Sequence, residues 1–571
     1  MSEVTYIKGK DACLEESIER MQNILKQAGF EITEASWLNP VPSVFSLHIH
    51  DLNCPGLFTN GKGTSRKSTL ASALGEFLER LSSNYFFSDY WLESHAQASD
   101  STWLYYPDEK QFALDEFQQC LTPELWSFYD TNQEYQPEDL LSLNDGSEFI
   151  RALRLIEQKT GNAVYFPMSL FSNIYASNGL SAGNTFLEAQ VQGLSEVFER
   201  WVKNRIMREN LCLPEVPETI INQFHDVVAA RDALIKEGIE LSIRDASLGG
   251  QFPVINVNLF EQKTGRCFAS FGAHPIFEVA LERTLTESLQ GRQLGDLDGF
   301  QTPVFDEGAV AEDENIENHF IDSSGLIHAR FVSTDYDYEF HHWDFSGTTE
   351  QQWQKLLGLV HQQGTDVYVG QYGHYDFPAV RLIVPGMSEI YPCEEVVESN
   401  QNIGRELRNY LLNMDASSDF NEKLNDIDAL GLSEHQGVAS LIGLMPDPGS
   451  FWSQIQVSDL RFWIALAAQN HEAALEALQE ALYFVDATSE RGVRYKAFEY
   501  ALEMVLSEQV CEASLVKLFG EELSSKVWQN VKGQELFFDA EIGLSIFKQS
   551  QRHQAMLSIY EMSREVKARV A

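Results

Sequence analysis

Residues 185–205 read TFLEAQVQGLSEVFERWVKNR and predict a helix of about six turns, at 3.6 residues per turn. One face of this helix carries Glu188, Gln192, Glu196 and Glu199 within roughly 80° of one another. The opposite face is apolar and suits packing against a core. Because like charges four residues apart destabilise a helix, the row of carboxylates indicates a bound hard cation. For this helix alone, an exposed face in an acidic protein explains the pattern equally well.

The same pattern occurs two more times in the chain. Residues 73–80 (ALGEFLER) align with residues 193–200 (GLSEVFER), and residues 284–291 (TLTESLQG) form a looser copy. Each copy follows a loop of small residues that suits a helix start, where free N–H groups attract anions. The polar positions that the copies share are Glu76 and Glu79, Glu196 and Glu199, and Glu287 and Gln290. Three units in one register predict a site where helices converge on metal-bound phosphates.

Charge limits the classes of partner. The 571 residues include 41 Lys and Arg against 85 Asp and Glu, which gives a formal net charge of −44. Nucleic-acid binding requires cationic surface, so direct binding to nucleic acid is not expected. An acidic chain can attract a basic partner, although solubility alone also explains the charge.

Cysteine usage and hydropathy limit the cellular context. The seven cysteines are far apart and form no C-x-x-C pair, which argues against a disulfide framework, a zinc ribbon or an iron–sulfur cluster. The sequence has no run of about eighteen apolar residues and begins MSEVTYIKGKDACLEE, which lacks the apolar region of a signal peptide. We therefore expect a cytoplasmic protein that does not enter a membrane.

The pattern along the chain predicts two domains. Residues 1–405 mix strand signals with the acidic loop–helix units, whereas residues 406–571 show helical periodicity only. Residues 86–165 are aromatic and loop-rich, and we expect them to form covering structure. The C-terminal helices include a repeat near 33 residues, close to the tetratricopeptide period of 34, and a plain helical bundle is the equal alternative. These helices are expected to recruit a partner, with capping of the first domain or a homodimer contact as alternatives.

The spacing of the polar residues resembles a known signature. The series S-x-x-N-x-x-x-E-x-x-x-Q-x-x-x-E-x-x-E-R, from Ser181 to Arg200, is similar to the ATP-binding signature of the YcaO family. The series E-x-x-E-R from Glu76 and R-x-x-x-E-x-x-Q from Arg283 resemble its other parts. Four further stretches are similar to stand-alone members of that family. They are WLNPVP (residues 37–42), FTNGKG (58–63), FIDSSG (320–325) and VPGMSEIYP (384–392).

The resemblance implies a fold, two cofactors and a set of site residues. The fold is an α/β (α+β) ATP-binding domain with mixed sheets, acidic helices and no Walker motif, followed here by an all-α, tetratricopeptide-like domain. The cofactors are ATP and Mg²⁺. The implied metal ligands are Glu76, Glu79, Glu188, Glu196, Glu199 and Glu287. The implied nucleotide contacts are Lys10, Ser17, Ser181, Asn184, Arg200, Arg283 and Gln290, and the implied catalytic residues are Glu199, Arg200 and Glu287.

The resemblance implies two different functions. Stand-alone members are associated with β-methylthiolation of an aspartate on a small-subunit ribosomal protein, where they assist a radical-SAM methylthiotransferase. Members that modify peptides instead use ATP to activate a backbone amide, forming azolines, thioamides or amidines. Azoline-forming members end in a proline-rich tail near the active site, whereas this sequence ends EVKARVA. We therefore expect an accessory protein with Mg-dependent ATPase activity, and amide activation is the alternative.

Overall fold

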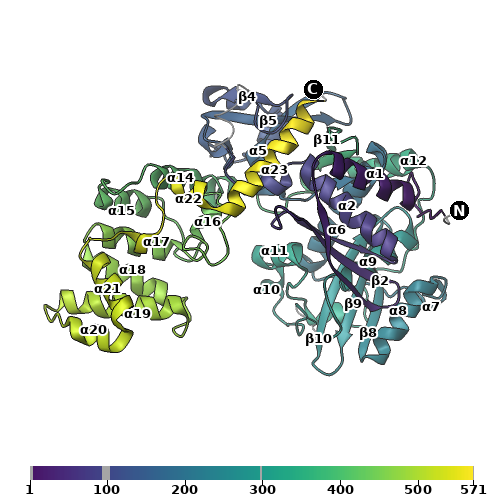
Figure 1. The fold of residues 1–571 in the computed structure, drawn as a ribbon. Coiled ribbons are helices and arrows are strands. Elements are labelled where there is room, and N and C mark those ends of the chain that lie inside the picture. The colour runs from purple at the N-terminus through teal and green to yellow at the C-terminus, as the bar shows by residue number, and fades with distance from the viewer. Residues whose placement is uncertain (1–3, 93–102, 296, 298, 570–571) are drawn as a thin grey trace.

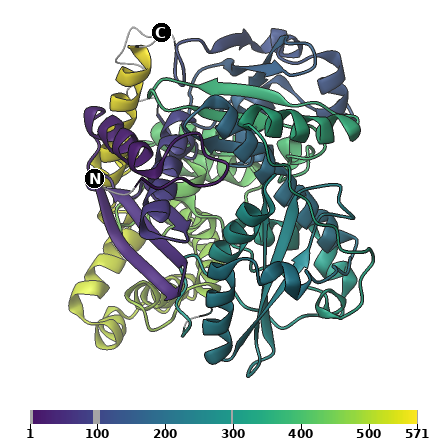
Figure 2. The same cartoon turned by 90° about the vertical axis from the view of Figure 1, so that its right-hand side faces the viewer.

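The computed structural model describes residues 4–92, 103–295, 297 and 299–569. Figure 1 shows a body of sheets and helices from which an arm of helices extends, and Figure 2 shows the same chain turned by 90°. Within the described ranges, no helix combines the length and the apolar character that crossing a membrane requires.

Three antiparallel sheets form the body. The first is β1 (Ile32–Val41), β2 (Val44–Asp51) and β3 (Phe58–Gly63), and the second is β8 (Ile239–Asp245), β9 (Val254–Glu261) and β10 (Arg266–Ala273). The third has the order β4 (Lys110–Ala113), β5 (Phe149–Glu157), β11 (Tyr368–Tyr372), β12 (Ala379–Ile383), β7 (Leu180–Ala182), with β6 (Ala163–Pro167) also paired to β5. All ladders between described strands are antiparallel, so the expectation of mixed sheets is wrong. Short turns join many of these neighbours, and such turns permit antiparallel pairing only.

The three predicted loop–helix units are present. They place α2 (Arg66–Ser82) on β2 and β3, α6 (Phe186–Arg208) on β7, β12 and β10, and α9 (Phe277–Ser288) on β9 and β10. The central helix begins one residue later than predicted, because Thr185 is its N-cap and accepts the N–H of Glu188 at 3.1 Å. Each of the three helices directly follows a strand, so the units share one architecture as well as one sequence register.

Glycine is required where each strand meets its helix. A Cβ atom on Gly61 would lie 2.3 Å from the carbonyl oxygen of Thr69 in α2. A Cβ atom on Gly272 would lie 2.1 Å from Oγ1 of Thr284 in α9, and Gly183 is crowded in the same way by α6. Real Cβ atoms do not approach other atoms so closely. The small-residue loops therefore allow a strand end to pack directly on the following helix.

Further helices complete the body. They are α1 (Leu14–Gln27), α4 (Pro123–Tyr129), α5 (Met168–Leu170), α7 (Glu218–Ile221), α8 (His225–Lys236), α10 (Glu307–Ala311), α11 (Asp313–Ile321), α12 (Thr349–Gln362) and α13 (Glu395–Glu398). Residues 86–165, expected to be loop-rich cover, contain β4, β5 and most of β6, so this segment supplies part of the largest sheet. Residues 93–102 of it lie outside the described residues.

The C-terminal part is helical, as predicted. Its helices are α14 (Ile403–Leu412), α15 (Phe420–Ala429), α16 (Val438–Leu441), α17 (Val457–Ala467), α18 (His471–Tyr483), α19 (Glu490–Leu506), α20 (Glu512–Phe519), α21 (Glu521–Val531), α22 (Ser545–Gln549) and α23 (Gln551–Ala568). We call α15 to α21 the arm; they share one core around Trp463, separate from the cores of the body. The tetratricopeptide character of these helices and the boundary at residue 405 stay predictions.

The last helix, α23, is bonded to the arm at its first turn, where the backbone N–H groups of Gln551 and Arg552 donate to Asp447 at 2.9 Å, and packs along the rest of its length against the body. Met556, Leu557 and Tyr560 are fully buried, and they belong to the same core as α2 and β5. The hydroxyl of Tyr560 donates to the carbonyl of Leu104 at 2.6 Å. In Figure 1, α23 runs from the base of the arm to a position beside β4 and β5. A C-terminal unit that begins at residue 406 therefore contains one helix that completes the first unit.

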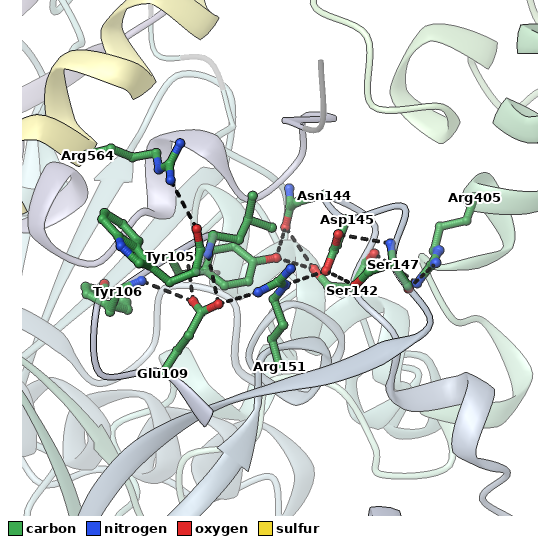
Figure 3. A network of polar contacts seen from close by, with 12 residues as sticks. Tyr105, Tyr106, Glu109, Ser142, Asn144, Asp145, Ser147, Arg151, Arg405 and Arg564 are labelled. Carbon is green, nitrogen blue, oxygen red and sulfur yellow. Dashed lines mark hydrogen bonds and ion pairs between the residues drawn. The ribbon is translucent and has the colours of Figure 1, made fainter. Parts of the chain in front are cut away.

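A polar network joins residues 103–151 to both α14 and α23 (Figure 3). The carboxylate of Glu109 accepts backbone N–H groups of residues 104–106, including Tyr105 at 2.7 Å, and pairs with Arg151 at 2.5 Å. From α14, Arg405 donates to the carbonyl of residue 147 at 2.9 Å. From α23, Arg564 donates to the carbonyl of residue 103 at 3.2 Å. The chain segments that enter and leave the arm are thus attached to one segment of the body.

Candidate functional site

The predicted site residues meet in one cavity. It has a volume of about 470 Å³ and lies between α1, α2, α6 and α9. Twelve of the thirteen predicted residues line it: Lys10, Ser17, Glu76, Glu79, Asn184, Glu188, Glu196, Glu199, Arg200, Arg283, Glu287 and Gln290. Their individual roles toward a nucleotide or a metal stay predictions. The structure shows that elements distant in sequence bring them to the same place.

The exception is Ser181. Its side chain is 1% exposed, does not line the cavity, and donates a hydrogen bond to the carbonyl of Ala189 at 2.6 Å. This bond fastens β7 to the second turn of α6. In this structure Ser181 therefore connects β7 to α6, and its predicted contact with a nucleotide stays a prediction.

Hydrogen bonds to Glu188 fix one end of the cavity. Its carboxylate accepts from Lys10 at 3.1 Å, from the backbone N–H of Asp11 at 2.8 Å and from Asn184 at 3.0 and 3.2 Å. Burial alone would raise the pKa of Glu188, but Lys10 and these N–H donors outweigh it and lower the pKa. Ser17 lies 2.7 Å from the amide oxygen of Asn184. Since protein donors occupy both of its oxygens, Glu188 anchors the N-terminal segment here, which differs from the metal role predicted for it.

The other end of the cavity holds a cluster of carboxylates from three helices. Burial raises the pKa of Glu79 to about 8; Arg80 opposes this rise, and Glu196 and Glu76 add to it. Burial also raises the pKa of Glu199. Carboxylates that raise one another's pKa in a low-dielectric site are stabilised by a nearby cation.

Protein cations lie among these carboxylates. Lys62, near the end of β3, forms an ion pair with Glu287. Arg200 pairs with Glu196 at 2.6 Å. Burial, with a smaller effect of Arg283, lowers the pKa of Lys62 to about 8. The cluster therefore combines acceptors suited to a metal with donors suited to phosphate oxygens.

The carboxylates fit a hard divalent ion by chemistry but are not arranged as a finished ligand set. Among the residues that the structure describes, no three His, Cys, Asp or Glu side chains are grouped so that they could hold an ion. Oxygen ligands and net negative charge are nevertheless what Mg²⁺ requires.

Several lining residues were given no site role from the sequence, although Gln192 was recognised on the acidic face of its helix. Lys62 stands between two glycines of a loop that the sequence marks only as small and flexible. Gln192 lies on the acidic face of α6 and bonds to Arg283 through its amide oxygen. His274 is buried, and its Nδ1 accepts the N–H of Ile276 at 3.0 Å, which leaves Nε2 as a donor. Burial, with Arg283 and Lys10, holds the pKa of His274 well below its usual value, so the ring is neutral at pH 7.

Comparison with known proteins identifies the family. The family profile described as YcaO cyclodehydratase, ATP- and Mg²⁺-binding, matches residues 60–388, and the profile of the YcaO cyclodehydratase C-terminal domain matches residues 404–569. The chain belongs to the YcaO family. This membership confirms the resemblance seen in the sequence, and the family description names the two expected cofactors, ATP and Mg²⁺.

Two curated YcaO relatives match along nearly their whole length. One, from Escherichia coli (strain K12), is named ribosomal protein S12 methylthiotransferase accessory factor YcaO; it is 42% identical over 581 residues, which cover 99% of both chains. The other, from Haemophilus influenzae, carries no functional name; it is 42% identical over 580 residues, which cover 98% of both chains.

Solved YcaO-type structures are more distant. A heterocyclase in complex with substrate and cofactor has a TM-score of 0.44 and 17% identity, covering 70% of this chain and 57% of that one. YcaO from Methanopyrus kandleri bound with AMPPCP and Mg²⁺ has a TM-score of 0.41 and 18% identity, covering 70% of this chain and 97% of that one.

Proposed function

We propose that this protein binds and hydrolyses Mg-ATP in the cavity between α2, α6 and α9, and that it acts as an accessory factor in methylthiolation of ribosomal protein S12. The observation that supports nucleotide binding most strongly is the convergence of twelve predicted residues on one cavity of about 470 Å³. The accessory role is supported by the 42% identity to the Escherichia coli protein of that name.

The two ends of the cavity have different roles in this proposal. Glu76, Glu79, Glu196, Glu199 and Glu287 are the residues that would hold Mg²⁺, which would neutralise phosphate charge when bound. Lys62, Arg80 and Arg200 provide N–H donors beside them for phosphate oxygens. Lys10, Ser17, Asn184, Arg283 and Gln290 complete the nucleotide contacts.

Glu199, Arg200 and Glu287 are the residues we assign to catalysis. They lie together at the carboxylate end, where the transferred phosphoryl group would be. The guanidinium of Arg200 is held at 3.0 Å from Oδ1 of Asn178 and stacks on Phe320 at 4.7 Å, so its orientation is set before any ligand binds. A fixed cation at this position stabilises charge that develops on the phosphoryl group.

We assign partner binding to the arm. Its helices carry no residue of the cavity, and the net charge of −44 favours a basic partner such as a ribosomal protein, at a rate that falls as salt rises. The methylthiotransferase itself is the second partner in this proposal, and a cytoplasmic location is part of the same proposal. A homodimer through the arm is the competing assignment.

Amide activation is the alternative function. It is favoured by the family description, which names a cyclodehydratase. The structure offers little support for the azoline-forming version, because the described residues of α23 do not line the cavity and its last turn is held by a hydrogen bond of Lys567 to Asn84 at 2.5 Å.

Calorimetry with Mg-ATP tests the nucleotide site. Glu199→Gln should weaken binding or turnover at least tenfold, equivalent to about 1.4 kcal/mol. Glu209→Gln is the matched control: it changes an exposed glutamate at the end of the same helix, whose pair with Arg205 is a surface pair of small value. Equal affinity in the parent and Glu199→Gln would refute the assignment.

A complementation assay tests the accessory role. Cells that lack the protein should recover methylthiolation of S12, read by mass spectrometry, when they express the parent or Glu209→Gln. Glu199→Gln should restore little of it. Full recovery with a variant that hydrolyses no ATP would separate the accessory role from the nucleotide site.

A further inference from the structure

A second, smaller pocket adjoins the nucleotide cavity. Its volume is about 70 Å³, and it opens at the carboxylate end of the cavity. The two share Glu199, Arg200 and Glu287, together with Phe271. A water molecule needs about 10–15 Å³ of such space, so this side pocket accepts an ion of a few heavy atoms and excludes a nucleotide.

Two sequence stretches without an assigned role form the outer wall of the side pocket. FIDSSG (residues 320–325) contributes Phe320 and Ser323, and VPGMSEIYP (residues 384–392) contributes Ile390. Neither stretch supplies a residue to the nucleotide cavity among the described residues. Both stretches therefore lie beside Glu199 and Glu287, the carboxylates assigned to catalysis.

The side pocket contains a buried cation without an ionic partner. The side chain of Lys203 is 7% exposed. Its ammonium donates to the carbonyl of His319 at 2.6 Å and to the hydroxyl of Ser323 at 3.0 Å, both of which are neutral. Glu199 and Asp322 favour the charge of Lys203, but neither forms an ion pair with it among the described residues, and an ammonium has a third proton to donate. A lysine this deeply buried is normally paired with an anion.

A second cation completes the lining. Arg200 reaches the pocket from the same face of α6, one turn before Lys203, and its guanidinium plane lies against Phe320 at 4.7 Å. A pocket with an unpaired ammonium, a guanidinium and a hydroxyl presents donors suited to a small oxyanion. Its position next to the carboxylates that would hold Mg²⁺ places it where the terminal phosphate of ATP separates.

We propose that the side pocket holds inorganic phosphate after its release from ATP, bound by Lys203, Arg200 and Ser323. In hydrolysis, an oxygen of water bonds to the γ-phosphorus as the bond from that phosphorus to the bridging oxygen breaks. ADP keeps the bridging oxygen, one proton of the water stays on the phosphate and the other passes to solvent, and the hydrogenphosphate moves into the side pocket. This inference rests on the proposed ATPase function and assigns to it a product site.

The test uses the full-length protein and inorganic phosphate. The protein is first saturated with Mg-ADP, and calorimetry measures this binding. The saturated protein is then titrated with potassium phosphate in the calorimeter. Lys203→Met, which keeps the length of the side chain, should weaken phosphate binding at least tenfold. Ser323→Ala should weaken it two- to fivefold, and Lys236→Met, which changes an exposed lysine at the end of α8, should leave it unchanged. All three variants should bind Mg-ADP like the parent.

The outcomes separate this inference from the proposed function. Failure of the parent to bind Mg-ADP overturns the nucleotide site and the side pocket together. Normal Mg-ADP binding with phosphate affinity that is equal in the parent, Lys203→Met and Ser323→Ala overturns the side pocket alone. A parallel titration with acetate distinguishes phosphate from a substrate carboxylate: acetate that binds as tightly as phosphate, and depends equally on Lys203, overturns the assignment to phosphate.

Discussion

Replacing Tyr560 by alanine tests whether α23 is part of the nucleotide-binding body. Its side chain is fully buried, its ring meets Phe87 edge-on at 5.4 Å, and its hydroxyl donates to the carbonyl of Leu104 at 2.6 Å. Both partners belong to the first part of the chain. If the structure is right, the substitution destabilises the body, although Tyr560 lies near the C-terminus.

The expected loss is large. Truncating a buried aromatic side chain to alanine costs about 3–5 kcal/mol, because packing is lost and a cavity remains. Tyr560→Phe keeps the ring and removes only the hydrogen bond to Leu104, which should cost about 1 kcal/mol, or up to about 3 if the carbonyl finds no other donor. The two variants thus separate packing from hydrogen bonding.

Hydrogen–deuterium exchange with mass spectrometry locates the effect. Tyr560→Ala should speed exchange in β5 and α2 by on the order of 10²–10⁴-fold, where exchange requires opening of the body. Exchange in α18 and α19 should not change. Tyr483→Ala is the control: that side chain is 85% exposed at the end of α18, and such surface changes cost within about 0.5 kcal/mol. Faster exchange in the arm alone would refute the placement of α23.

Three further predictions concern glycine packing, pH and the signature serine. Gly272→Ala should push β10 from α9 and weaken Mg-ATP binding in calorimetry, whereas Gly358→Ala, at an open position within α12, should stabilise the fold by about 0.5–1 kcal/mol in thermal melts. Burial raises the pKa of Glu389 to about 7, so the folded state binds this proton more tightly than the unfolded state does. The stabilising effect of the bound proton should be complete below about pH 4.5, and the free energy of unfolding should fall by at most about 3 kcal/mol as pH rises through 7. Glu389→Gln should flatten that pH profile in urea titrations. Ser181→Ala should lower the melting temperature but leave the affinity for Mg-ATP unchanged, and a tenfold loss of affinity would restore it as a contact.

The sequence predicted that glutamates from three helices converge, because the spacing that implies it is local. On α6, the spacing of Glu188, Glu196 and Glu199 sets their common face, whatever the helix packs against. The recurrence of that spacing around Glu76 and Glu287 then implied convergence. Every one of these side chains lines the cavity.

What the sequence could not show depends on contacts between distant segments. Lys62 is a neighbour of Glu287 only after β3 and α9 pack together, so its ion pair left no local signal. Glu188 has the spacing of a metal ligand, yet its carboxylate accepts hydrogen bonds from the side chain of Lys10 and the backbone N–H of Asp11. Ser181 matches the signature, but a spacing does not say whether a hydroxyl faces the cavity or the helix behind it.

The position of α23 also changes how the roles of the arm and the body can be separated. A fragment that ends at residue 405 lacks the arm, but it also lacks a helix that buries Met556, Leu557 and Tyr560 in the core of the body. Such a fragment would fail to bind ATP whether or not the arm recruits a partner. Substitutions at the exposed far end of the arm, such as Tyr483→Ala, change the arm and leave the body complete.

The same geometry gives the arm a physical connection to the nucleotide site. Arg405 at the start of α14 and Arg564 in α23 both donate to carbonyls of residues 103–147, and the same segment leads into β5 of the largest sheet. That sheet continues to β7, whose end precedes α6 and its row of glutamates. A force on the arm therefore acts on the body at two points of one segment, through packed elements rather than a flexible linker. An accessory protein whose partner binds the arm needs such a connection for ATP turnover to depend on that partner.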